Sequence, residues 1–84
     1  MATYRVMYWQ EIPSQVRAED GTDEVNLPLG PEFEKLIDKK ALERGLVGTD
    51  EYLEHWRWSE EQKRPGAARE VAEAVAEELR KQTF

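Results

Sequence analysis

The order of the predicted elements indicates an α+β fold, a two-layer sandwich in which an antiparallel sheet of about four strands carries two helices on one face. Three observations support this class. The chain opens with a strand-like segment at residues 3–10, closes with a helical segment at residues 67–81, and holds a second amphipathic helical segment from Pro31. Amphipathic helices combined with antiparallel strands are typical of such sandwiches. We therefore expect the order βββαβα in a single domain over residues 1–84.

The first predicted strand, residues 3–10, is rich in aromatic and β-branched side chains. Large residues occupy both of its faces, with Tyr4, Val6 and Tyr8 alternating with Arg5, Met7 and Trp9. This alternation and composition favour a strand. Large side chains on both faces indicate a central strand, or one whose second face binds something.

A β-hairpin is predicted to follow. Residues 12–14 should break the first strand, because their proline cannot donate a hydrogen bond to a sheet ladder. Residues 15–19 form the next predicted strand, Asp20-Gly21 is a turn dipeptide, and residues 24–27 return as a third strand. The carboxylates around this turn lack the spacing of an EF-hand loop, so we expect a solvated hairpin tip and no calcium site.

The first predicted helix begins at Pro31, because proline suits the first helical turn. Its apolar residues recur at a spacing near 3.6, namely Phe33, Leu36, Ile37, Ala41 and Leu42. The helix should end at Arg44. Gly45 can adopt the left-handed conformation that follows a helix, with Leu46 packing back as in a Schellman motif.

The segment from Thr49 to residue 62 fits two periodicities. Tyr52, Leu53 and Trp56 share a helical face, yet Tyr52, Trp56 and Trp58 also alternate as in a strand. We favour one helical turn over residues 50–54, which Thr49 would cap, followed by a strand over residues 55–62. Residues 63–66 should end that strand.

The last helix, residues 67–81, has the clearest pattern. It is rich in strong helix formers. Its apolar stripe consists of Ala68, Val71, Ala72, Val75 and Leu79. These mostly small residues would let the helix pack closely against a sheet.

Composition and charge exclude several classes of function. The chain carries 18 acidic and 12 basic side chains, a net charge of −6, and no cysteine. The acidic excess is the same in both halves and no basic stripe stands out, which argues against nucleic acid and anionic membranes as partners. The absence of a signal peptide pattern and of a long apolar stretch indicates a cytoplasmic protein.

Catalytic and cofactor-binding motifs are absent from the sequence. His55 is the only histidine, and no nucleophile elbow or triad order accompanies it. One histidine without cysteine does not make a zinc site, and no phosphate-loop or dinucleotide fingerprint is present. We therefore predict no catalytic residue, no metal and no cofactor.

The candidate binding residues are aromatic. Six of the eight aromatic residues lie in two short segments, Tyr4 to Trp9 and Tyr52 to Trp58. The candidate patch consists of Trp9, Tyr52, His55, Trp56 and Trp58. These tryptophans can belong to the core, or at least one can lie on an exposed apolar patch and anchor an interface; the sequence leaves both interpretations open.

Three short motifs resemble a small bacterial family, the virulence factor domain. They are Trp9-x-x-Ile12-Pro13-Ser14-Gln15-Val16, Phe33-x-x-x-Ile37-Asp38 and Tyr52-Leu53-x-x-Trp56. The family name reports a phenotype and supplies no catalytic residues to carry over. The resemblance implies an accessory or interaction role, since stand-alone members can accompany one-carbon or corrinoid methyl-transfer enzymes.

We expect from these observations a small cytoplasmic interaction module without enzymatic activity, which docks on a protein partner through its aromatic residues. One alternative is a small-ligand binder or minor enzyme with a pocket around Tyr52 and His55. A further alternative is a module that associates with itself through sheet edges or faces.

Overall fold

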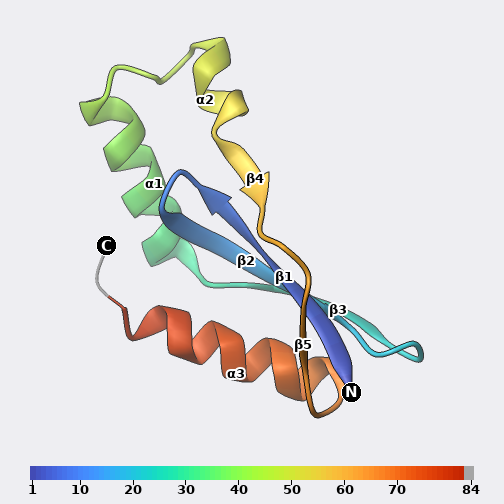
Figure 1. Cartoon of the computed structure of the whole chain (residues 1–84). Helices are drawn as coiled ribbons and strands as arrows, with labels where there is room; N and C mark the ends of the chain where they lie inside the picture. Colours follow the sequence, from blue (N-terminus) through green and yellow to red (C-terminus); the bar gives the residue numbers. More distant parts are fainter. Residues whose placement is uncertain (83–84) are drawn as a thin grey trace.

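A computed structural model of the chain describes residues 1–82 as five strands and three helices (Figure 1). The strands are β1 (Ala2–Trp9), β2 (Ile12–Glu19), β3 (Glu24–Pro28), β4 (Trp56–Trp58) and β5 (Gln62–Arg64), and the helices are α1 (Pro31–Glu43), α2 (Asp50–Glu54) and α3 (Ala68–Arg80). The predicted α+β class is confirmed. The predicted order βββαβα and the counts of about four strands and two helices are wrong in detail, because the order is βββααββα. Residues 83 and 84 of the predicted domain lie outside the described residues.

The strands form one antiparallel sheet in the order β3-β2-β1, and both β4 and β5 pair with the outer edge of β1. β4 pairs with residues 7–9 of β1, and β5 pairs with residues 2–4. The single strand predicted over residues 55–62 is therefore two short strands. Lys63 and Arg64, which were expected to end a strand, belong to β5.

Ser59 fills the gap between β4 and β5. Its hydroxyl accepts a hydrogen bond from the Val6 backbone N–H at 2.9 Å, and its own N–H donates to the Val6 carbonyl at 2.8 Å. The Ser59 hydroxyl thus takes the place of the backbone carbonyl that would otherwise accept the Val6 N–H in the sheet. This exchange keeps β1 hydrogen-bonded while the chain leaves the sheet between the two strands.

The turn between β1 and β2 lies at Gln10 and Glu11, earlier than predicted. Gln10 has φ 54°, the left-handed conformation that ends β1. β2 then begins at Ile12 and includes the proline that was expected to break the sheet. Proline is tolerated there because Pro13 pairs with Tyr8 next to a bulge, where Ser14 is the extra residue, and bulges are among the positions where sheets accept proline.

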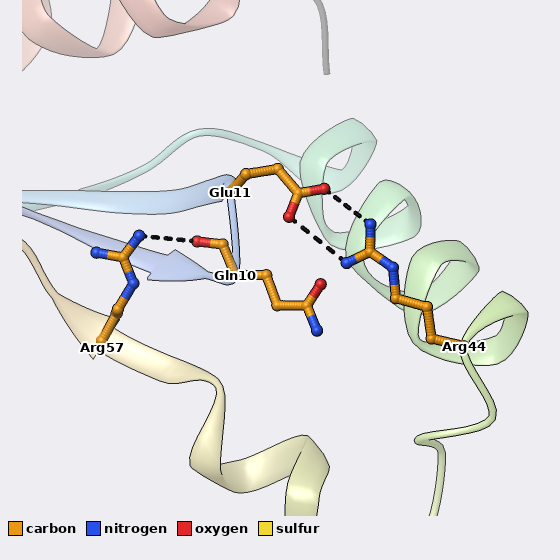
Figure 2. Close-up of polar contacts among 4 residues, drawn as sticks. All are labelled: Gln10, Glu11, Arg44 and Arg57. Carbon is orange, nitrogen blue, oxygen red and sulfur yellow. Dashed lines mark hydrogen bonds and ion pairs between the residues drawn. The ribbon is translucent and has the colours of Figure 1, made fainter.

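The helices cover different parts of the sheet, which corrects the expectation of two helices on one face. α3 packs along β1, β2 and β3 through a buried stripe of small and branched residues, namely Ala68, Val71, Ala72, Val75, Ala76 and Leu79. α1 contacts β2 and lies beside the end of the β1–β2 hairpin, and α2 leads into β4 on the side away from α3 (Figures 1 and 2).

The ends of α1 form as predicted. Pro31 occupies the first turn. After the helix, Gly45 has φ 68°, the Leu46 N–H donates to the Ala41 carbonyl at 2.9 Å, and the Gly45 N–H donates to the Leu42 carbonyl at 3.1 Å. These two bonds define a Schellman motif, and Leu46 is buried beneath it. Leu42, which was expected in the apolar stripe, is 71% exposed instead.

Asp20 joins the β2–β3 turn to the start of α3. One carboxylate oxygen accepts the N–H groups of Thr22 and Asp23, at 2.9 and 2.7 Å, and the other accepts the N–H of Ala68 at 2.9 Å. The hydrogen bond from Ala68, followed by those from Thr22 and Asp23, lowers the pKa of Asp20. The hairpin tip is therefore more than a solvated acidic cluster, because Asp20 satisfies a helix N-terminus that is distant in sequence.

We expect Ser59→Ala to destabilise the fold by about 1–2 kcal/mol, because it leaves the Val6 N–H without its acceptor. Ser59→Thr is the matched control, since it keeps the hydroxyl. Urea unfolding of both variants measures the effect. Equal stability of Ser59→Ala and the parent chain would show that the bond to Val6 is dispensable.

We expect Asp20 to make stability depend on acidic pH. Its pKa is lowered in the folded state, so the ionised carboxylate stabilises the fold above the ordinary pKa of aspartate. That contribution is lost as the pH falls through the lowered value. Asp20→Asn removes the charge, so its unfolding free energy should change less than that of the parent chain over this window. Parallel curves for the two proteins in acid denaturation would contradict this role.

Candidate functional site

Trp9 is the centre of the region that holds the predicted aromatic residues. It is fully buried, and its indole N–H donates to the Tyr52 carbonyl at 2.9 Å. Its ring packs against Tyr52, with centroids 5.6 Å apart, and edge-on against His55 at 5.7 Å. Trp9 therefore belongs to the core, where it attaches α2 to the sheet, and presents no surface to a partner.

Tyr52 and Trp56 are half-buried and stand over Trp9. Their rings meet edge to face at 6.2 Å. Together with residues of β2 and α1 they line a hollow of about 290 Å³, which we call the aromatic pocket. Its lining residues are Ser14, Glu34, Ile37, Asp38, Tyr52 and Trp56.

The walls of the aromatic pocket are held by the β1–β2 turn. Arg44, just after α1, forms a two-pronged ion pair with Glu11, with N–O distances of 3.0 and 3.5 Å (Figure 2). Arg57 of β4 donates to the Gln10 carbonyl at 3.2 Å, and the Gln10 N–H donates to the His55 carbonyl. The turn thus connects the C-terminal end of α1 with β4. These contacts join the two elements that carry most of the pocket residues.

The contacts of Glu11 lower the pKa of its carboxylate. A hydrogen bond from its own backbone N–H and then the hydrogen bond from the Arg44 guanidinium lower its pKa. Both groups are largely solvent-exposed, so the ion pair itself contributes little to stability. Its role is to keep the end of α1 beside the hairpin.

The aromatic pocket carries an uncompensated negative charge. Glu34 and Asp38 lie one helical turn apart on α1 and both line the hollow. Within residues 1–82 neither carboxylate takes part in an ion pair, whereas six other acidic residues do. No lining residue is basic. The pocket therefore has a formal charge of −2.

His55 does not line the aromatic pocket. It lies half-buried against the edge of Trp9, and within residues 1–82 its ring forms no hydrogen bond. The pocket predicted around Tyr52 and His55 exists only at Tyr52. Over residues 1–82 no group of three or more His, Asp or Glu residues is placed to hold a metal ion, and no helix is long and apolar enough to cross a membrane.

Trp58 is separated from the other four candidate residues. It is 37% exposed, pairs with Met7, and lies two residues beyond Trp56 on the same face of β4. It borders a second, polar hollow of about 280 Å³ with Arg5 and Arg17. The structure thus brings Trp9, Tyr52, His55 and Trp56 together and leaves Trp58 on the uncovered part of that face.

Sequence reasoning missed four pocket residues, namely Ser14, Glu34, Ile37 and Asp38. Three of them occur in the motifs that carry the family resemblance. Those motifs come from β2, α1 and the α2–β4 segment, and they meet at the aromatic pocket. The available signal was that these residues occur in the motifs of the resemblance, although each motif alone reads as a turn or an amphipathic helix.

The family model described as "Virulence factor" matches residues 7–83, which includes every residue that lines the aromatic pocket. The comparison with curated proteins and the comparison with solved structures each found no match.

We expect Trp9→Phe to destabilise the fold by about 2 kcal/mol, because it removes buried volume and leaves the Tyr52 carbonyl without its donor. Trp58→Phe is the matched control and should change stability by less than about 0.5 kcal/mol, since Trp58 is partly exposed. Chemical denaturation of both proteins provides the measurement. A Trp9→Phe protein as stable as Trp58→Phe would contradict the role of the indole N–H.

Proposed function

Because the chain belongs to the virulence factor family, we propose that it is a small cytoplasmic interaction and accessory module that has no catalytic activity and docks on a protein partner. One observation carries the proposal: Tyr52 and Trp56 border an open hollow while the residues beneath them are fully packed. Half-buried aromatic side chains at a hollow are typical of residues that anchor protein interfaces.

The surroundings of the aromatic pocket support binding more than catalysis. Its lining residues combine aromatic, aliphatic and carboxylate groups, and the single histidine lies outside it. Stand-alone members of the family can accompany one-carbon or corrinoid methyl-transfer enzymes, so such an enzyme is the first class of partner to examine. The acidic net charge of −6 favours a protein over a nucleic acid or an anionic membrane.

Binding of a free small ligand is the second candidate function. The pocket volume of about 290 Å³ lies at the lower end of the range for small-molecule sites, roughly 300–1,000 Å³. Such sites usually enclose most of the ligand, whereas this hollow lies between exposed carboxylates of α1 and half-buried rings. The open shape of the hollow favours a side chain of a protein partner over a free small ligand.

The test is a tagged pull-down from the native lysate with mass spectrometry, using the parent chain, Trp56→Ala and Leu53→Ala. Trp56→Ala should weaken capture of the specific partner by about 30-fold, the equivalent of about 2 kcal/mol. Leu53→Ala is the control, because Leu53 is an exposed apolar residue of α2 outside the pocket lining. Circular dichroism establishes that each variant is folded.

Trp58→Ala extends the same experiment to the uncovered face. The sequence predicts that Trp58 anchors the complex, so its removal should also weaken capture without unfolding the domain. Loss with Trp58→Ala but not with Trp56→Ala would move the interface to the polar hollow. Capture unchanged by either variant, or a parent chain that only binds itself in sedimentation, would refute docking through these aromatic residues.

A further inference from the structure

We propose that the aromatic pocket receives an arginine side chain of the partner protein, bound between the carboxylates of Glu34 and Asp38 and the rings of Tyr52 and Trp56. This inference rests on the proposed docking function and names the group that the pocket recognises. It follows from the charge, the aromatic walls and the size of the hollow.

The charge of the pocket favours a cation. Glu34 and Asp38 are four residues apart on α1, a spacing at which like charges repel and weaken a helix. Neither has an intramolecular cationic partner within residues 1–82, although five arginines and one lysine elsewhere are paired with glutamates. An incoming cation relieves the repulsion and adds two charge-assisted hydrogen bonds.

The aromatic walls favour a planar cation. Tyr52 and Trp56 meet at an interplanar angle of 84°, so the two rings form a corner that exposes ring surface to the hollow. A guanidinium stacks on such surfaces while its N–H groups remain free for carboxylates. The same chain already uses this contact elsewhere, since the Arg57 guanidinium lies 5.2 Å from the centroid of the Tyr8 ring.

The size and floor of the pocket fit one long side chain. The hollow measures about 290 Å³, and its lining includes Ile37, which is 2% exposed. The half-buried rings of Tyr52 and Trp56 offer the apolar surface on which an arginine can lay its aliphatic stem while its charged end reaches the carboxylates. Ser14 adds a hydroxyl at the bulge of β2, and its carbonyl already accepts the Leu29 N–H at 3.0 Å. The wall that carries Ser14 is therefore held in place.

The experiment titrates the ¹⁵N-labelled full chain with N-acetyl-arginine N-methylamide and follows its NMR spectrum. The neutral citrulline analogue and the lysine analogue are the comparison probes. The arginine probe should shift the Trp56 indole and Tyr52 amide signals in a saturable way, and the citrulline analogue should bind at least about tenfold more weakly. The affinity of the lysine analogue should lie between those of the other two probes. Its ammonium is charged, but it lacks the planar group that can stack on a ring while it donates two hydrogen bonds to a carboxylate.

The variants Glu34→Gln and Asp38→Asn should each weaken the arginine probe several-fold, and the double variant should abolish saturable binding. Glu43→Gln is the matched control, an exposed carboxylate on α1 outside the pocket. All three exchanged residues are exposed, so the fold should persist. Equal binding of the arginine and citrulline probes, equal binding of arginine and lysine, no saturable shift, or full binding by the double variant would each overturn the proposal.

The same double variant separates this inference from the proposed function. In the pull-down, a partner that depends on Trp56 but is retained by Glu34→Gln/Asp38→Asn shows docking without arginine recognition, which overturns only the inference. A partner that is lost from both variants supports both. Retention of the partner by Trp56→Ala overturns the proposed docking through the pocket, whatever the arginine probe shows.

Discussion

The hydrogen bond between the indole of the fully buried Trp9 and the Tyr52 carbonyl is the contact on which the candidate site depends. This bond lies at the end of β1, beyond the part of the sheet that α3 covers. It attaches α2 to the sheet, and a helix of five residues would not be stable alone. Tyr52 and Trp56 can border an open hollow only because Trp9 fills the space beneath them. A fully buried tryptophan thus supports the half-buried rings of Tyr52 and Trp56 without itself reaching the surface.

The β1–β2 turn adds a second constraint on the same region. Its backbone bonds to the α2–β4 segment on one side, and its glutamate pairs with Arg44 after α1 on the other (Figure 2). The neighbouring bulge at Ser14 changes the register of β2 and accommodates Pro13. Bulges commonly re-aim side chains next to functional sites, and here the extra residue lines the aromatic pocket.

The two faces of the sheet differ in how they are covered. α3 buries the face that carries Val6, Val16 and Ala18, and Asp20 fixes the start of that helix. On the other face, the aromatic pocket lies at the end of the sheet near α1. Trp58 lies on the same face and lines the polar hollow together with Arg5.

The sequence by itself determined the elements whose cause is local. The apolar stripe of α3, the proline at the start of α1 and the Schellman motif at Gly45 follow from helical periodicity and from residues with restricted or permissive backbones. Tertiary structure decided the rest. The helical turn predicted over residues 50–54 is present as α2, but only pairing with β1 and the Ser59–Val6 bonds split the following strand into β4 and β5. The burial of Trp9 and the convergence of Ser14, Glu34, Asp38 and Trp56 arise from contacts between segments far apart in the chain, which no local pattern encodes.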